Sequence, residues 1–208
     1  PTLSVVSEND KGVVISGMKM LATSAIFANE IWIGNLIPLA PDQVKQSITC
    51  AMPCNANGLS LWMRQPLSNH YDNQFDAPLS WNQDETDVLV MCDKVLVPWE
   101  RIFVKDDAIQ AREIYFKTPA HCYGNHQSNV RYWSKMELIV GLCYKVAKAT
   151  GADEVPAVRE TLGKMSALES TLSGMIYGQI ENAENWPENF KTFNRRIMYA
   201  ALNFCTDN

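Results

Sequence analysis

The sequence lacks the features that mark several large classes of protein. It has no basic run, and 18 Lys and Arg against 23 Asp and Glu give its 208 residues a formal net charge of −5. An acidic chain of this kind is not expected to bind nucleic acid or a membrane surface through charge. It has no stretch of about 18 uncharged apolar residues, which a membrane-spanning helix needs, and no secretory leader. We therefore expect a cytoplasmic protein with neither nucleic-acid nor membrane partners.

Cysteine is also scarce. Six cysteines in 208 residues are too few for a disulfide scaffold, and several stand inside apolar runs, which predicts buried, reduced thiols. Cys50 and Cys54 do not have the CxxC spacing of a zinc knuckle, and the sequence has no second cysteine pair that could complete a zinc site with them. Because a closed zinc site takes four ligands, we expect no metal.

The apolar pattern of the first hundred residues is that of β-strands. Short β-branched runs are separated by turn residues, and segment 8–12 has the composition of a hairpin turn. The predicted strands are 3–7, 12–16, 30–34, 47–52, 59–63, 88–92 and 94–98. Strands this short and this closely spaced predict an antiparallel β-sandwich or barrel.

The second half of the chain has a helical period. From Tyr132 onward, apolar residues recur at spacings of three and four. Gly151 is expected to end this helix, and Asp153 to cap the next, which runs to about Asn182. A third, shorter helix follows the Trp186-Pro187 pair. Three long helices do not close a core, because four are the usual unit, so we expect a partner helix from the rest of the chain or from another subunit.

The predicted fold class is therefore α+β, with an antiparallel β domain followed by long amphipathic helices of an incomplete bundle. The predicted boundaries are 1–104 for the β domain, 105–118 for a linker and 119–208 for the partial helical bundle. The first residue is Pro1 and not Met. We therefore expect a processed chain or a piece of something longer.

One candidate ligand-binding segment lies where the apolar pattern breaks after Leu21. Thr23 and Ser24 form a short run of small hydroxyl residues before an apolar strand restarts at Phe27. Such a break can present backbone N–H groups and two hydroxyls to a ligand, although a turn bonded to its own backbone is more common. The acidic run 84–87 suits a cation or acid–base chemistry, but is more often a solvated loop.

A second candidate segment is 121–133, at the predicted start of a helix. It holds His121 and His126, two of the three histidines, beside amides, an arginine and aromatic residues. A helix N-terminus suits an anion such as a pyrophosphate, and histidine can act as a base near neutral pH. Helix capping and polar interface contacts explain the same residues equally well. Cys122 could join the histidines on a metal, but a fourth ligand is lacking.

Four segments taken together carry a family resemblance. They are GMKMLATSAIFANEIWIG (17–34), AMPCNANGLSL (51–61), DETDVLVMCDKVLVPWERIF (84–103) and NHQSNVRYWSKMELIVGL (125–142). In this order they resemble the 4-hydroxyphenylacetate 3-hydroxylase family, the oxygenase components of two-component flavin monooxygenases. The resemblance implies an acyl-CoA-dehydrogenase-like fold, of which the chain covers the middle β domain and the front of the C-terminal helical bundle that drives tetramer formation.

The resemblance also implies a reaction. A separate flavin reductase supplies reduced FAD, which reacts with molecular oxygen to a C4a-hydroperoxide that hydroxylates a phenol similar to 4-hydroxyphenylacetate at the ortho position. The flavin carries the difficult chemistry, and the protein supplies a dry, oriented pocket. Substrate-binding residues of the family's N-terminal domain have no counterpart here. This chain alone is therefore not expected to be active.

The β domain receives two implied roles. Thr23 matches a threonine of the "LAT" block that approaches the flavin ring in the family, and Ser24 beside it is included as cofactor-binding. Asn35 and Leu36 lie nearest to a loop that lines the phenol pocket in some members, and are the implied substrate-binding residues.

The resemblance also implies two roles for residues of the helical half. His121 or His126 corresponds to a histidine that helps to deprotonate the phenol in members acting on other phenols, and the resemblance does not choose between them. Gln127 and Arg131 sit where related dehydrogenase folds contact the flavin diphosphate across a subunit interface, so we assign them to cofactor binding and expect a homotetramer or a homodimer.

Two alternatives stand beside this hypothesis. The chain can be a non-catalytic structural or oligomerisation fragment. It can also resemble 4-hydroxybutyryl-CoA dehydratase, whose iron–sulfur cluster needs a cysteine near His126. Trp133 occupies the required position, and Cys122 precedes the histidine, so the dehydratase is disfavoured.

Overall fold

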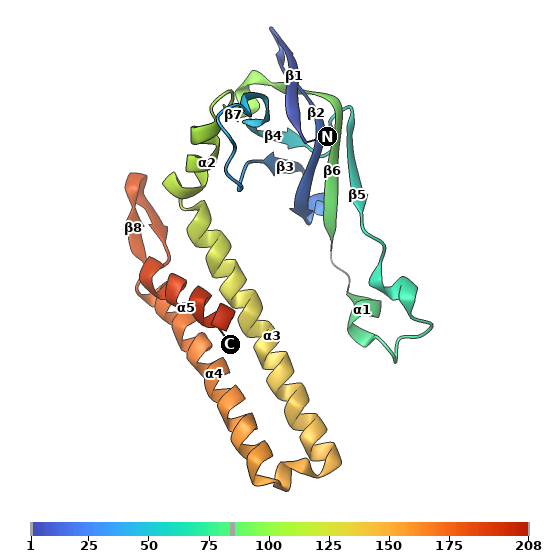
Figure 1. Ribbon diagram of the computed structural model, residues 1–208, viewed down its shortest axis with the longest axis vertical. Helices are drawn as coiled ribbons and strands as arrows, with labels where there is room; N and C mark the ends of the chain where they lie inside the picture. The colour runs from blue at the N-terminus through green and yellow to red at the C-terminus, as the bar shows by residue number, and fades with distance from the viewer. Residues whose placement is uncertain (1, 84–85, 208) are drawn as a thin grey trace. The chain divides into compact units, whose positions relative to one another are not determined.

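The computed structural model describes residues 2–83 and 86–207, and the chain divides into two compact units, Pro1–Ile114 and Tyr115–Asn208. The first unit is built from antiparallel strands and the second from long helices (Figure 1). The predicted α+β class is therefore confirmed. None of the helices in the described ranges is long and apolar enough to cross a membrane.

Two sheets make up the first unit (Figure 1). Neighbouring strands run antiparallel in both sheets. One sheet has the order β1-β2-β6-β5, with β1 at Ser4–Asn9, β2 at Gly12–Thr23, β6 at Asp87–Pro98 and β5 at Leu59–Met63. The other has the order β3-β4-β7, with β3 at Glu30–Ile33, β4 at Thr49–Pro53 and β7 at Ile102–Val104.

The inward side chains of both sheets form one apolar core. Val13 and Val90 from the first sheet share a buried cluster with Ile31 and Met52 from the second, which is the packing of a β-sandwich. Alternation along each strand places these residues inside and polar neighbours outside. The sandwich predicted from the strand spacing is therefore present.

Two thiols in this core have raised pKa values and are unreactive at neutral pH. Cys50 and Cys92 are buried. Loss of hydration raises the pKa of Cys50 to about 12 and that of Cys92 to about 11. Since the thiolate is the reactive form, neither is a nucleophile at neutral pH. All six cysteines are free thiols, as predicted.

The local turn signal at 8–12 is confirmed, but several strand boundaries differ from the prediction. β1 ends at Asn9 and β2 begins at Gly12, and the Asn9 side chain accepts a hydrogen bond from the N–H of Lys11. The predicted strands 88–92 and 94–98 are a single strand, β6, with a bulge at Lys94. The Lys94 N–H donates to the Ser16 hydroxyl at 2.8 Å, which keeps the bulged backbone paired.

Short helices occupy two segments for which no helix was predicted. Helix α1 is Pro78–Asn82, and α2 is Ala108–Lys117. α2 lies within the predicted linker 105–118, so most of that linker is helical. It crosses the boundary between the two units.

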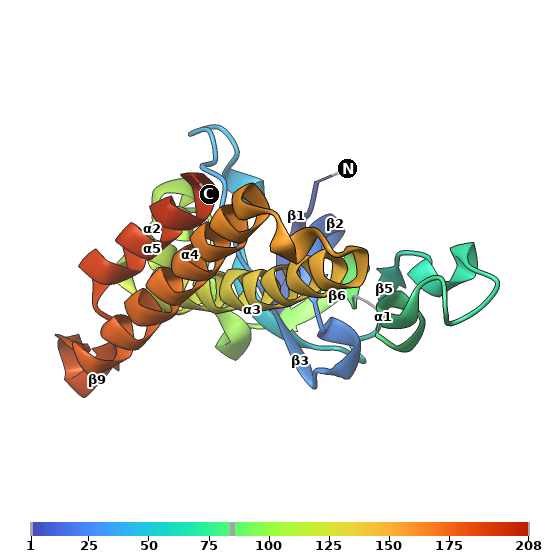
Figure 2. The same ribbon diagram turned by 90° about the horizontal axis from the view of Figure 1, so that it is seen from below.

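The second unit is a helical hairpin with a third helix packed on it (Figures 1 and 2). α3 (Ala120–Thr150) and α4 (Pro156–Glu181) are the two long arms, and α5 (Arg195–Asp207) packs against both. A small hairpin, β8 (Glu184–Trp186) and β9 (Phe190–Thr192), joins α4 to α5.

The turn between α3 and α4 matches the prediction at one end and not at the other. Gly151 ends α3 with φ 72° and donates its N–H to the carbonyls of Ala147 and Lys148. The predicted Asp153 cap is wrong, because Val155 precedes α4 and Asp153 lies in a 3-10 turn. Pro156 opens α4, and proline is favoured there since the first helical N–H needs no partner.

Candidate functional site

Thr23 and Ser24 lie at the end of β2, opposite the start of β6. Thr23 is paired with Asp87 across the sheet, and its hydroxyl donates to the Asp87 carboxylate at 2.5 Å. Ser24 has a left-handed backbone with φ 62°, and its N–H donates to the carbonyl oxygen of Thr86 at 3.2 Å. The strand therefore continues through Thr23, two residues beyond the predicted break.

This arrangement leaves a hydrogen-bond acceptor on the surface. Both side chains are exposed. A hydroxyl has one donor and two acceptor lone pairs, and Asp87 takes the donor of Thr23. The Thr23 oxygen is thus oriented as an acceptor for an N–H group of a ligand.

Thr86 and Asp87 are neighbours of the candidate site that the sequence pattern did not connect with Thr23. They belong to the acidic run 84–87, of which Asp84 and Glu85 lie outside the described residues. The signal was a polar run directly before a strand, but its partner is more than sixty positions away and only strand pairing identifies it.

Asn35 is hydrogen-bonded on both sides of its side chain, and the substrate-binding role that the resemblance implied stays a prediction. It is 6% exposed, and its side-chain oxygen accepts a hydrogen bond of 2.6 Å from the Lys19 ammonium. Its amide donates to the carbonyls of Gln46 and Ile48, at 3.2 and 3.3 Å. Asn35 therefore joins β2 to both ends of segment 35–48, and partial burial lowers the pKa of Lys19.

The neighbouring side chains of this segment have the opposite character. Leu36 is 70% exposed and Ile37 is 80% exposed. An exposed apolar pair directly beside a fully bonded anchor suits contact with an apolar ligand surface. Leu36 thus presents an apolar side chain to its surroundings, and its implied substrate-binding role stays a prediction.

His121 has both ring nitrogens engaged within the helical unit. It is buried, and its Nδ1 lies 3.2 Å from the carbonyl oxygen of Tyr115 and 3.0 Å from that of Thr118. Carbonyls only accept, so Nδ1 carries the proton, and Nε2 lies 3.2 Å from the Cys122 sulfur. These contacts point to a structural role at the start of α3.

His126 is half-buried and has a free edge. Its Nδ1 is 2.8 Å from Oε1 of Gln179 on α4, and its ring stacks on Phe193 with centroids 3.6 Å apart. Among the described residues, Nε2 has no hydrogen-bond partner. The sequence pattern did not identify Gln179 or Phe193, since each lies more than fifty positions away from His126 and no local signal points to them.

Gln127 and Arg131 lie within α3 and not at its N-terminus. Both are exposed, and residues four apart share one face of a helix. α3 begins at Ala120, so the unpaired N–H groups of its first turn lie further back. Any anion at Gln127 and Arg131 would be held by the side-chain amide and guanidinium.

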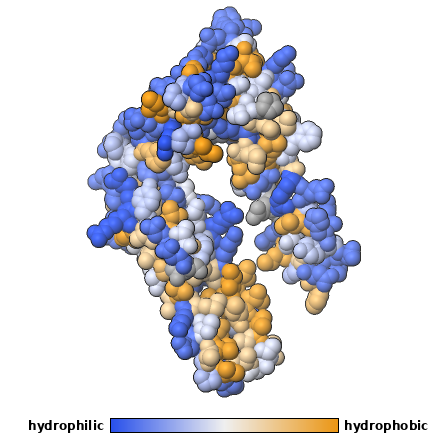
Figure 3. All heavy atoms as spheres, in the orientation of Figure 1, coloured by the Kyte–Doolittle hydropathy of each residue, from blue (hydrophilic) through white to orange (hydrophobic). Residues whose placement is uncertain are grey.

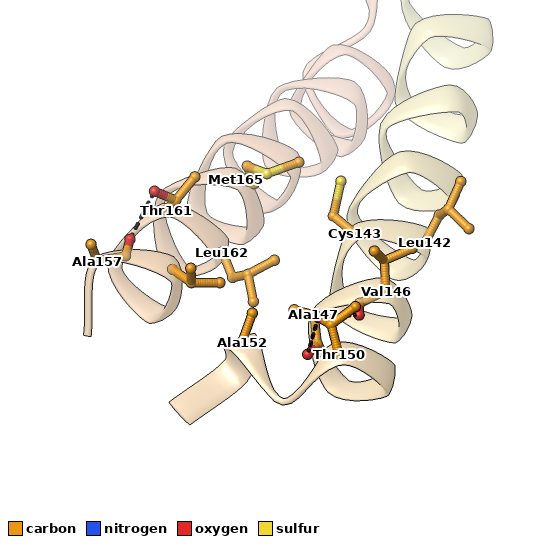
Figure 4. A pocket seen from close by; sticks show the side chains of 11 residues that line it. Leu142, Cys143, Val146, Ala147, Thr150, Ala152, Ala157, Thr161, Leu162 and Met165 are labelled. Carbon is orange, nitrogen blue, oxygen red and sulfur yellow. Dashed lines mark hydrogen bonds between the residues drawn. The ribbon is translucent and has the colours of Figure 1, made fainter. Parts of the chain in front are cut away.

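An apolar groove lies at the far end of the α3–α4 hairpin. Figure 4 shows side chains of both helices facing one another across it, including Cys143, Leu162 and Met165. The same end of the hairpin is rich in apolar residues on the face seen in Figure 3. On α3, Leu138, Ile139, Leu142 and Val146 are each more than half exposed. Within residues 2–83 and 86–207, no three His, Cys, Asp or Glu side chains gather as a metal site.

Comparison with known proteins places the chain in one family along its length. The description "4-hydroxyphenylacetate 3-hydroxylase N terminal" matches residues 1–104, and "4-hydroxyphenylacetate 3-hydroxylase C terminal" matches residues 111–208. The pyoverdin chromophore biosynthetic protein PvcC of Pseudomonas aeruginosa is 30% identical over 183 residues, which are 85% of this chain and 36% of that protein. The 4-hydroxyphenylacetate 3-monooxygenase oxygenase component of Thermus thermophilus is 32% identical over 163 residues, 78% of this chain and 34% of that protein. The chain spans about a third of the length of these curated relatives.

Solved structures of the same family are similar to this chain. The oxygenase component HpaB of 4-hydroxyphenylacetate 3-monooxygenase, complexed with FAD, superimposes with a TM-score of 0.85 at 29% identity, over 97% of this chain and 42% of that one. A probable acyl-CoA dehydrogenase from Mycobacterium abscessus shares the fold, with a TM-score of 0.63 at 13% identity, over 99% of this chain and 50% of that one. The chain belongs to the 4-hydroxyphenylacetate 3-hydroxylase family.

Proposed function

We propose that the chain is part of a reduced-FAD-dependent monooxygenase that hydroxylates a phenol at the ortho position. The observation that carries the proposal is the family match over residues 1–104 and 111–208. The HpaB structure solved with FAD and 4-hydroxyphenylacetate supports a phenol of that kind as substrate. Reduced FAD, when bound, supplies the activation of molecular oxygen.

The residues present fit such a cofactor in their donor and acceptor chemistry. The ring of a reduced flavin offers N–H groups, and the Thr23 oxygen is an exposed acceptor whose own proton is given to Asp87. The diphosphate of FAD needs cationic and amide donors, and Arg131 and Gln127 provide one of each on exposed turns of α3. We assign Thr23, Ser24, Gln127 and Arg131 to cofactor binding.

We propose His126, and not His121, as the base for the phenol. A base needs an accessible lone pair. His126 has one at Nε2, whereas both nitrogens of His121 are engaged. Transfer of the phenol proton to Nε2 breaks the phenol O–H bond and leaves a phenolate, whose ring is richer in electrons and reacts faster with an electrophilic oxygen.

The partners follow from this chemistry. A separate flavin reductase would supply reduced FAD, and the name of a relative from Burkholderia cepacia, an FADH2-dependent monooxygenase, is in line with this. The apolar, exposed end of the α3–α4 hairpin supports a homo-oligomer of two or four subunits. Six free thiols favour the reducing cytoplasm as its location.

The function is tested with the full-length protein, reduced FAD, oxygen and a panel of phenols that includes 4-hydroxyphenylacetate. We expect an ortho-dihydroxylated product, identified by mass spectrometry, formed with one oxygen atom from ¹⁸O₂. Product with unlabelled oxygen, or no product from any phenol together with no binding of reduced FAD, would refute the proposal.

Thr23→Ala tests the cofactor assignment. We expect the variant to fold normally, because an exposed hydroxyl contributes at most about 1 kcal/mol. The fraction of consumed oxygen that appears in product should fall severalfold, with hydrogen peroxide rising to match. Thr23→Ser keeps the hydroxyl and should retain most of the coupling. Unchanged coupling in Thr23→Ala would remove Thr23 from the site.

A further inference from the structure

The helical unit contains a buried polar cluster that packing does not explain. Asn129, Gln179 and Thr192 are 0%, 0% and 3% exposed. Within the part of the chain that the structure describes, three of their atoms lack a hydrogen-bond partner, namely Asn129 Oδ1, Gln179 Nε2 and Thr192 Oγ1. An unpaired buried polar atom costs about 1–3 kcal/mol, so apolar residues would make this core more stable.

Among the residues that the structure describes, Gln179 makes its side-chain hydrogen bond with His126. Gln179 Oε1 lies 2.8 Å from His126 Nδ1, and the imidazole lies flat on Phe193, with 12° between the ring planes. The backbone also fixes Gln179, since its carbonyl accepts the N–H of Asn194 at 3.0 Å. The imidazole is therefore held at its Nδ1 edge from α4 and on its face by the residue that follows β9.

These contacts determine which ring nitrogen carries the proton. An amide oxygen only accepts hydrogen bonds, so His126 Nδ1 is the protonated nitrogen and Nε2 keeps its lone pair. The other half of the Gln179 amide is a donor, and Asn129, one turn beyond His126 on α3, has an unused acceptor.

Charged groups on the surrounding elements do not compete for the imidazole. Glu184 is paired with Arg195 at 2.8 Å, which holds the pKa of Glu184 below its usual range. The Tyr123 hydroxyl donates to the Lys191 carbonyl. Titratable side chains on the elements packed around His126 include His121, Cys122, Tyr123, Tyr177, Glu181, Glu184, Lys191, Arg195, Arg196 and Tyr199. Of these, none forms a hydrogen bond with the His126 ring in the described ranges.

We propose that Gln179 is a positioning residue, which fixes the Nδ1–H tautomer of His126 so that Nε2 receives the phenol proton. The inference deepens the proposed function and rests on it. A neutral amide suits this task, because it orients the ring without stabilising the imidazolium as strongly as a carboxylate would.

Gln179→Glu and Gln179→Met test the proposal in the full-length protein. Gln179→Glu keeps an acceptor for Nδ1–H and adds a negative charge, which raises a neighbouring pKa by about one unit or more. The acid limb of the hydroxylation rate should therefore move to higher pH by that amount. Gln179→Met has similar length but no acceptor. It should fold at least as stably and lose about tenfold or more in hydroxylation rate, while binding reduced FAD normally.

A second readout does not depend on activity. Diethyl pyrocarbonate modifies the neutral imidazole, and peptide mass spectrometry reports His126 and His70 separately. We expect the midpoint for His126 to rise in Gln179→Glu, while His70, an exposed residue of the other unit, keeps its midpoint as an internal control. An unchanged midpoint for His126 would overturn the inference even if the protein hydroxylates phenols. A shifted midpoint in a protein that makes no product would refute the proposed function and leave the tautomer control by Gln179 standing.

Discussion

At the scale of single residues, what separates the candidate site residues is how much of their hydrogen-bonding capacity the fold already uses. The side-chain oxygen of Asn35 accepts a hydrogen bond from Lys19, and its amide donates to two backbone carbonyls. His121 is used in the same way at the start of α3. Thr23 and His126 each keep an acceptor atom open, and are therefore the residues on which substrate or cofactor chemistry can act.

Asn35→Ala and Leu36→Ala should therefore separate anchoring from ligand contact. Asn35→Ala leaves the carbonyls of Gln46 and Ile48 without a donor, which costs about 1–3 kcal/mol of unfolding free energy. Leu36→Ala removes an exposed side chain and should cost less than about 0.5 kcal/mol, while raising the KM for the phenol severalfold. Urea unfolding and steady-state kinetics of the full-length protein measure both. A stable Asn35→Ala variant with a raised KM for the phenol would show that Asn35 contacts the substrate and does not act as an anchor.

The sequence singled out the segments of the candidate site but did not show the state of each side chain. The hydroxyl run at Thr23 and the histidines at the start of α3 were visible because unusual residue types stand together locally. The burial of Asn35 depends on segment 46–48 and on Lys19, and the orientation of His126 depends on Gln179. Those partners are distant in sequence, so residue type and spacing could not show which nitrogen or oxygen remains free.

At the scale of elements, two local signals were reliable, whereas a feature that depends on strand pairing was predicted wrongly. The hairpin turn at 8–12 and the end of α3 at Gly151 depend on a few adjacent residues, and both are as predicted. The continuity of β6 depends on its pairing with β2, because Ser16 bonds the bulged Lys94 from the neighbouring strand. A single strand was therefore predicted as two.

Gly58 and Gly151 both have a positive φ, but only at Gly58 would an added Cβ clash with a neighbouring strand. Gly58 has φ +85°, and a Cβ there would lie 2.3 Å from the carbonyl oxygen of Asp93, whereas at Gly151, with φ +72°, no described atom comes within 4 Å. Gly151→Ala should cost about 1–2 kcal/mol for its left-handed backbone alone. Gly58→Ala should cost more, since a strand backbone must also move.

Chemical denaturation of the two alanine variants measures this difference. Gly151→Asn is the control, because asparagine tolerates the left-handed region better than alanine, and it should recover part of the loss. Equal losses of unfolding free energy in Gly58→Ala and Gly151→Ala would mean that the β4–β5 turn can move away from the added Cβ. That result would contradict the steric conflict expected with Asp93.

At the scale of the whole molecule, the apolar end of the α3–α4 hairpin is the feature that the chain does not account for by itself. Leu142 is 57% exposed on α3 and lies beside the groove between the two helices (Figure 4). Exposed apolar side chains gathered on one face are typical of a surface covered by another element or subunit. The proposed homo-oligomer would bury them.

Leu142→Glu should therefore weaken assembly of the full-length protein. An unpaired carboxylate in an apolar interface costs several kcal/mol, so the dissociation constant should rise by about tenfold or more, and sedimentation should detect smaller species. Thr171→Glu adds the same charge at an exposed position of α4 outside the groove and should leave the assembly intact. If Leu142→Glu sediments as the parent protein does but unfolds more readily, the same chain covers this face. Unchanged assembly and unchanged stability together would show that nothing covers it.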